Sequence, residues 1–167
     1  MKIVLLLSLL VLFLTGCGAR VETWETVEDT VAVTESASPV YDIIVGLPEA
    51  ALTDETDNSR RYETEYLQVE TSMFQAKDLN DAVHYLSGFE AENLTILQTT
   101  RFDLPEYQFA WYCQTEEGGR LCRADLVMDG TTCYGVVCSF SEEAGEIAWT
   151  EARQVFSAFG LTPAEIL

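Results

Sequence analysis

The sequence has few of the residues from which catalytic centres are built. It contains one histidine, His84. No Gly-x-Ser-x-Gly elbow, His-Glu-x-x-His pair, phosphate-binding loop or dinucleotide fingerprint is present. Helical spacing places His84 opposite the apolar side of a short predicted helix, where a solvated histidine is expected. We therefore predict no catalytic residue, no metal site and no cofactor.

Basic residues are also scarce, and this excludes one class of partner. Nine Lys and Arg face 28 Asp and Glu, which gives a formal net charge of −19. Nucleic-acid binding and electrostatic docking on anionic lipid both depend on basic side chains. We predict no nucleic-acid partner. The acidic surface fits solubility and colloidal repulsion, and it also fits a basic partner or bound cations.

The chain lacks an apolar run long enough for a membrane span. Residues 3–14 form an apolar run of about a dozen residues behind Lys2, which is typical of a signal-peptide core and short of the ~20 that a spanning helix needs. The run ends in Leu14-Thr15-Gly16-Cys17, which resembles the lipobox of bacterial lipoproteins. The resemblance implies that residues 1–16 are a signal peptide, that Cys17 carries a lipid, and that the protein is anchored on the extracytoplasmic face of the cell membrane.

The residues after Cys17 divide into two parts. Gly18 to Pro39 is acidic and rich in Glu, Thr, Val and Ser, without helical spacing, so 17–39 is predicted to be the acylated cysteine and a flexible tether. The alternating part of this segment is alternatively an extended stretch that pairs locally, with Trp24 as a contact residue. Residues 40–167 are predicted to form a single domain.

Two helices are predicted in this domain. Asp78 caps a short helix with an apolar face formed by Leu79, Ala82, Val83 and Leu86, and Gly88 ends it. A longer C-terminal helix starts at Ser141 and ends at Gly160 as a glycine C-cap. Its predicted apolar stripe consists of Ala148, Ala152, Val155, Phe156 and Phe159.

Strand signals fill most of the remaining domain. The Asp129-Gly130 pair predicts a type I′ hairpin turn, and residues 53–61 read as a polar turn region. Oxygen-bearing side chains at Asp54, Thr56 and Asn58 suit a weak Ca²⁺ loop, although a solvated loop is favoured because the EF-hand glycine and final Glu are missing. The six predicted strand segments are 40–48, 62–74, 93–104, 107–115, 120–128 and 131–140.

These elements predict the fold class α+β: an antiparallel sheet of about six strands flanked by a short central helix and a longer C-terminal helix. The order of these strands and helices, with "YDIIVGLP" opening the domain and "ARQVFSAFGL" near its end, resembles that of the PsbP-like fold. That resemblance implies helices beside an antiparallel sheet, and a binding or assembly module rather than an enzyme.

Four cysteines follow Cys17, namely Cys113, Cys122, Cys133 and Cys138. A turn at Glu117-Gly118 or over Glu116 to Gly119 places Cys113 opposite Cys122, whereas a Gly118-Gly119 turn places it opposite Ala124. The Asp129-Gly130 turn places Cys122 opposite Val137 and Cys133 opposite Leu126. Cys133 and Cys138 point to opposite faces of one strand, so Cys113 to Cys122 is the predicted disulfide, with buried free thiols as the alternative. Zinc is not expected because no Cys-x-x-Cys pair gathers the thiols.

Strand alternation also predicts two apolar faces on the hairpins. One carries Arg123 and Asp125 among apolar groups, and the other is entirely apolar. Helices on both faces of the sheet account for this pattern. Alternatively, Tyr112 and Tyr134 line an exposed contact patch.

The sequence favours a non-catalytic binding or accessory module with a protein partner at the cell envelope, because it combines a lipid anchor, a tether and a compact domain with no recognisable set of catalytic residues. The alternative is an envelope hydrolase that uses carboxylates or a bound cation. A third hypothesis is a domain stabilised by Ca²⁺.

Overall fold

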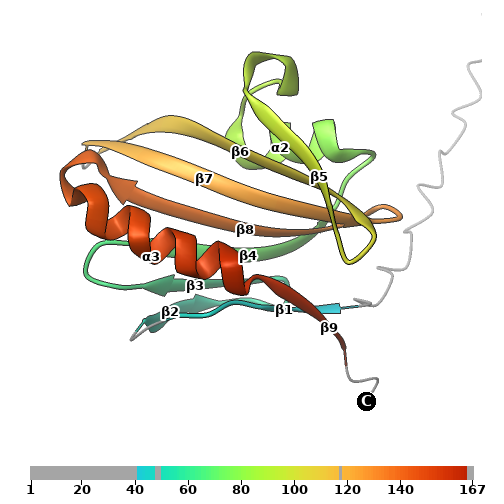
Figure 1. The fold of residues 1–167 in the computed structure, drawn as a ribbon, viewed down its shortest axis with the longest axis horizontal. Helices are drawn as coiled ribbons and strands as arrows, with labels where there is room; N and C mark the ends of the chain where they lie inside the picture. Colours follow the sequence, from blue (N-terminus) through green and yellow to red (C-terminus); the bar gives the residue numbers. More distant parts are fainter. Residues whose placement is uncertain (1–40, 48–49, 117, 165–167) are drawn as a thin grey trace, which may run out of the picture. The chain divides into compact units, whose positions relative to one another are not determined.

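The computed structural model describes residues 41–47, 50–116 and 118–164 (Figure 1). These residues belong to one unit, Ser38–Leu167. The predicted signal peptide, Cys17 and the tether lie outside the described residues, so the domain boundaries stay a prediction.

The centre of the fold is a seven-stranded antiparallel sheet in the order β2-β3-β4-β8-β7-β6-β5. The predicted α+β class is confirmed. Strands β6, β7 and β8 are the longest and form a meander. The strands are β2 (Ala51–Glu55), β3 (Ser59–Glu63), β4 (Gln68–Gln75), β5 (Ile96–Arg101), β6 (Leu104–Thr115), β7 (Gly118–Asp129) and β8 (Thr132–Ser141).

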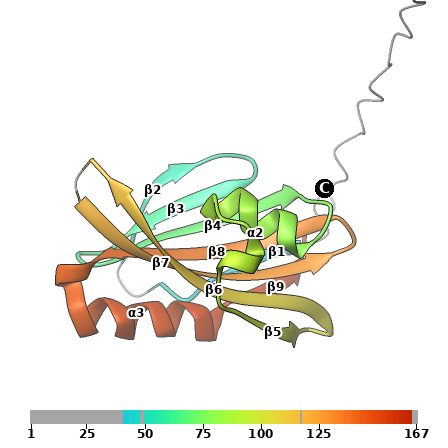
Figure 2. The same ribbon diagram turned by 90° about the horizontal axis from the view of Figure 1, so that it is seen from above.

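Helices cover the two faces of this sheet (Figures 1 and 2). Helix α2 (Leu79–Ser87), followed by the 3₁₀ turn η1 (Ala91–Asn93), packs on the face that carries Ala124, Leu126 and Cys133, which we call the α2 face. Helix α3 (Gly145–Ala158) packs on the face that carries Val127, Val136 and Phe140, which we call the α3 face. Covering on both faces therefore explains most of the two apolar patterns, although Ala110 and Tyr112 on the α3 face stay exposed.

The predicted boundaries of α2 are confirmed. The Asp78 carboxylate accepts a hydrogen bond from the Asp81 amide at 2.9 Å, which satisfies an N-terminal donor that has no partner inside the helix. Gly88 ends the helix in the left-handed region at φ 74°, where glycine carries no Cβ penalty. Leu79, Ala82 and Val83 are buried, as their spacing predicts.

The C-terminal helix differs from its prediction at both ends. The turn η2 (Glu142–Ala144) precedes α3, and Ser141 makes no side-chain capping bond. The helix ends at Ala158 with Phe159 as C-cap, and Gly160 opens strand β9 (Gly160–Pro163) instead of capping the helix. The apolar stripe is confirmed, because Ala148, Ala152, Val155, Phe156 and Phe159 are all buried.

Strand β9 pairs with β1 (Tyr41–Ile44) in a separate two-stranded sheet. The predicted first strand therefore exists, but it lies outside the main sheet. Ile43 and Leu161 lie opposite each other and pack against the α3-side core. Apolar residues after the helix thus continue the core, which explains why Gly160 serves as the start of a strand.

Three hairpin turns are among those that differ from expectation. Residues 53–61 are largely the β2–β3 hairpin, which the polar composition hid. Strand β8 starts at Thr132 opposite Asp129, so Gly130 and Thr131 form the turn; only Gly130 has positive φ (61°), as at the first central position of a type II′ turn. Cys122 therefore lies opposite Ser139, and Cys133 opposite Met128, two residues away from the predicted register.

The third turn joins β5 to β6 within the predicted strand 93–104. Phe102 and Asp103 have φ of 55° and 63°, and Arg101 pairs with Leu104 across them. Two successive positive φ angles define a type I′ turn, for which Phe-Asp is an unusual sequence.

Neither helix of the described part of the chain is long and apolar enough to cross a membrane.

Candidate functional site

Helix α3 leaves part of its face of the sheet uncovered. Val136 and Phe140 on the covered strand β8 are at most 1% exposed, whereas Leu97 on β5 is 61% exposed. Two hollows lie in this uncovered part and share Arg123, one beside β5 and one beside α3. We call them together the α3 groove; its lining residues are Thr95, Leu97, Gln108, Phe109, Ala110, Arg123, Gly145, Glu146, Trp149 and Arg153.

An ion cluster borders the groove under the end of α3. Arg101 donates from Nε to Glu106 at 2.6 Å and from Nη2 to Asp125 at 3.3 Å. Arg123 reaches the other oxygen of Asp125 at 3.4 Å. Glu106 and Asp125 are 2% and 0% exposed, so the cluster holds two carboxylates between two arginines inside the core. Arg101 also donates to the carbonyl of Phe159, which joins β5 to the end of α3.

Aromatic rings of α3 and its C-cap complete this cluster. The guanidinium of Arg101 lies over Phe159 at 4.9 Å from the ring centroid, and that of Arg123 lies over Phe156 at 4.2 Å. Such stacking offsets part of the cost of desolvating a cation. The cluster therefore fixes Arg123, the residue shared by the two hollows, in one place.

Burial raises the pKa of Asp125 from 3.8 to about 6. Arg123 and Arg101 act in the opposite direction, and the neighbouring Glu106 raises the pKa further. Loss of hydration penalises a buried carboxylate in its charged form, and the two arginines only partly compensate. Asp125 is therefore a group that takes up a proton in mildly acidic solution.

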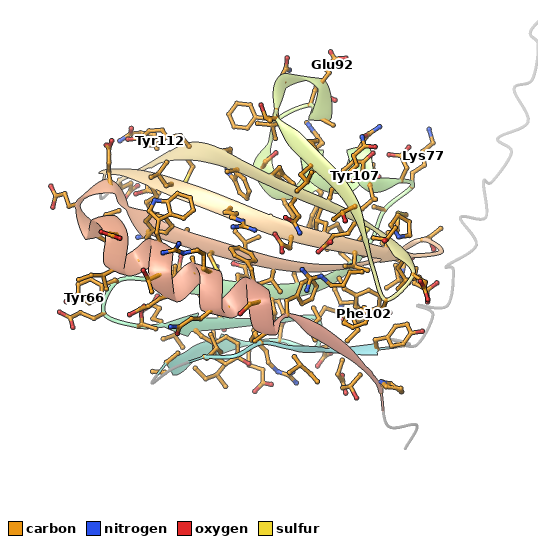
Figure 3. The ribbon with its side chains drawn as sticks, in the orientation of Figure 1. Tyr66, Lys77, Glu92, Phe102, Tyr107 and Tyr112 are labelled. Atoms are coloured by element: carbon orange, nitrogen blue, oxygen red, sulfur yellow. The ribbon has the colours of Figure 1, made fainter. Side chains whose placement is uncertain are left out.

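The alternative prediction, a contact patch of Tyr112 and Tyr134, is wrong in one member. Tyr134 is 0% exposed and lies edge-on to Tyr41 at 5.7 Å between ring centroids. Tyr112 is 48% exposed near the β6–β7 end of the sheet, labelled in Figure 3. Its ring lies over Gly119, where a Cβ atom would overlap the Tyr112 hydroxyl. Only Tyr112 thus contributes to the surface.

Cys113 and Cys122 lie side by side on the α2 face. Cys113 pairs with Arg120 and Cys122 with Trp111, so the two are diagonal neighbours, in a register that none of the considered turns gives. Their sulfur atoms are 3.3 Å apart and both thiols are free. Burial, and next the contact with Cys113, raise the pKa of Cys122 to about 12. The disulfide stays a prediction, which mass measurement of unreduced protein tests.

The other two cysteines are core residues on opposite faces, as strand alternation predicts. Cys133 belongs to the α2-side core and Cys138 to the α3-side core, and both are 0% exposed. Burial raises the pKa of each thiol to about 12. Both therefore pack as small apolar side chains.

His84 is a surface residue, as expected. Its side chain is 53% exposed and its Nδ1 lies 3.3 Å from Glu90. In the turn between β2 and β3, the Thr56 hydroxyl accepts hydrogen bonds from the amides of Asn58 and Ser59. Within the described ranges, no three His, Cys, Asp or Glu residues are grouped to hold a metal ion.

The sequence did not predict a role for Arg101 and Glu106, although it did predict Arg123 and Asp125 as charges on an apolar face. The missed signal is the hairpin itself. Once Phe102-Asp103 is a turn, strand alternation places Glu106 beside Asp125 on the α3 face, and Arg101 beside both.

Comparison with known proteins shows the fold alone. No family model and no curated protein matches the chain. A solved structure from Bacteroides thetaiotaomicron aligns with a TM-score of 0.50 at 11% identity, over 74% of this chain and 46% of that one. This chain thus spans about half the length of that protein.

A second similar structure is LpqN, described as involved in cell envelope biogenesis of Mycobacterium tuberculosis. It aligns with a TM-score of 0.49 at 12% identity, over 74% of this chain and 84% of LpqN. Neither likeness tests the lipobox or the resemblance to the PsbP-like fold, which stay predictions.

Proposed function

We propose that the chain is a lipid-anchored extracytoplasmic lipoprotein whose folded part is a non-catalytic binding module. The observation that carries the binding role is the α3 groove. It is open to solvent, it carries the exposed aliphatic side chain of Leu97, and Arg123 is held at its centre by Asp125 and Phe156. Apolar surface around a fixed polar group is what recognition sites offer.

The anchor rests on Leu14-Thr15-Gly16-Cys17. Its test is labelling of growing bacterial cells with a fatty-acid analogue, with Cys17→Ala beside Cys113→Ala as the matched control. The label is expected on the unmodified chain and on Cys113→Ala and absent from Cys17→Ala. Equal labelling of all three would exclude Cys17 as the lipid site.

The binding role is tested with a photo-crosslinking amino acid placed in the full chain on intact cells. Ala110 is exposed in the α3 groove, and Leu52 is a control on the opposite edge of the sheet, 49% exposed. A discrete adduct is expected from position 110 and none from position 52. Equal adducts, or none from either, would contradict a binding role for the groove.

The alternative, a carboxylate-dependent hydrolase, is favoured by one observation: Glu106 and Asp125 form a pair of buried acids. However, both accept hydrogen bonds from Arg101, and neither lines the α3 groove. A substrate would therefore have to displace Arg101 to reach them. Turnover that Glu106→Gln or Asp125→Asn abolishes, measured with and without chelator, would establish the hydrolase instead.

A further inference from the structure

We propose that the outer edge of β5 binds an extended polypeptide in which apolar residues alternate with basic ones, as an added strand of the sheet. The inference rests on the proposed binding function and names the ligand class. Its grounds are the free main-chain groups of β5, the absence of edge protection, and the two differently charged hollows beside the strand.

The register identifies the main-chain groups that are free. Arg101 and Leu104 flank a two-residue turn, and such a pair exchanges hydrogen bonds across the hairpin. Every second pair repeats this pattern, which leaves Ile96, Gln98 and Thr100 with N–H and C=O groups directed away from β6. Pro105, opposite Thr100, fits this assignment because it has no N–H to donate.

The stretch of β5 that carries these groups has no protecting residue of its own, because the one charge of the strand, Arg101, lies at its end. Ile96 to Thr100 carry no charge, no proline and no glycine, and their pairing with β6 has no register shift. Within the described part of the chain, no strand pairs with the outer side of β5. Natural sheets usually protect an edge with charges, proline or a bulge, so an unprotected edge is suited to accept a strand.

A strand added to β5 would direct its side chains alternately to two hollows. On the α3 face lie Leu97 and Ala110, with Thr95, Gln108 and Arg123 around them. On the α2 face lie Glu90 and Glu92, with Ile96, Gln98 and Asn80 among the lining residues. Figure 3 shows Glu92 beyond β5, on the side away from α3.

Charge complementarity then selects the occupant. Apolar side chains suit the hollow around Leu97, and basic side chains suit the hollow that contains Glu90 and Glu92. A second copy of this chain would bring its own acidic hollow and a net charge of −19 to the contact. The structure therefore favours a partner segment with alternating apolar and basic residues.

The test measures binding of synthetic peptides to the full-length chain in detergent. The probe alternates valine and lysine over about nine residues, within the usual range of strand lengths. We expect saturable binding, and binding about tenfold weaker when glutamate replaces lysine or when alternate backbone nitrogens are methylated. No binding of the valine–lysine peptide, or equal binding of the methylated peptide, would overturn the proposal.

Two matched variants locate the site. Leu97→Lys and Leu52→Lys each place a lysine on an exposed leucine of an edge strand, and circular dichroism checks that both fold. Leu97→Lys is expected to weaken binding about tenfold and Leu52→Lys to leave it unchanged. Equal effects would overturn the proposal, and so would self-association of the chain that Leu97→Lys abolishes, because the occupant would then be a second copy.

The two proposals fail separately. An adduct from position 110 on cells, together with no peptide binding, leaves a binding groove without strand addition. Peptide binding that depends on Leu97, without an adduct on cells, supports the β5 edge as a peptide site and contradicts its use in the cellular role proposed above.

Discussion

The two edges of the sheet carry the same kind of ion pair in opposite surroundings. Across the β2–β3 hairpin, Glu55 and Arg60 are 2.7 Å apart with side chains 51% and 46% exposed. Across the β5–β6 hairpin, Arg101 and Glu106 are 2.6 Å apart with side chains 20% and 3% exposed. The distances are nearly equal, so the difference between the pairs lies in burial.

The edges also differ in their protection. Strand β2 has a register shift between Leu52 and Asp54 and ends in two acids, Asp54 and Glu55, whereas Ile96 to Thr100 of β5 have neither a register shift nor a charge. The side chains of Arg101 and Glu106 in the β5–β6 hairpin instead point inward, into the core beneath α3. At the β2 edge the charged side chains are exposed and repel an added strand. At the β5 edge they are buried and fix a hairpin whose outer side stays open to one.

The largest effect that tests the comparison is loss of the buried arginine. Arg101→Met is expected to lower the free energy of unfolding by about 3–5 kcal/mol, because it leaves Glu106 buried without its arginine. The matched change Arg60→Met should cost at most about 1 kcal/mol, because that pair is exposed. Urea denaturation at neutral pH measures both, and similar costs would refute the distinction.

The next effect is a pH dependence of stability that arises from Asp125 on the β5 side of the sheet. Because the folded-state pKa of Asp125 is raised from 3.8 to about 6, the stability due to its protonation is complete below pH 3.8 and is lost as pH rises through 6. Relative to Asp125→Asn, the unmodified chain should therefore lose up to about 3 kcal/mol between pH 4 and 7. Urea denaturation at several pH values measures the difference.

Two features make this measurement interpretable. Arg101, Arg123 and Glu106 surround Asp125 and stay unchanged in the variant. Asp54→Asn, at an exposed position on β2, provides the matched control variant. A difference between the unmodified chain and Asp125→Asn that is constant with pH would contradict the assignment.

The smallest effect concerns the turn of the β5 hairpin. Phe102 has φ of 55°, a left-handed backbone conformation that costs about 1 kcal/mol. Its side chain is 56% exposed, so burial of the ring offsets little of this cost. Phe102→Asn should raise the free energy of unfolding by about 1 kcal/mol. Phe89→Asn, at an exposed phenylalanine without positive φ, is the control; equal changes would argue against strain at Phe102.

The sequence predicts the fold where local signals agree with burial. Asp78, Gly88 and the α3 stripe are confirmed because capping and helical spacing act within a few residues. The β2–β3 hairpin was missed because its residues are polar. The role of Gly160 as the first residue of β9 was missed because the partner strand β1 is distant in the sequence. The β5–β6 turn was missed because Phe102-Asp103 contradicts the usual turn preference. Without that turn, the sequence did not predict the ion pair of Arg101 and Glu106 or the position of β5 at the edge of the sheet.

The most direct test of the account is amide hydrogen exchange of the full-length chain, residue by residue, with and without the valine–lysine peptide. Without peptide, Ile96, Gln98 and Thr100 should exchange quickly and Leu97 and Thr99 slowly. With peptide, exchange at the first three should slow while β2 stays unchanged. Protection spread equally over both edges, or none on β5, would contradict the claim that β5 is the docking edge.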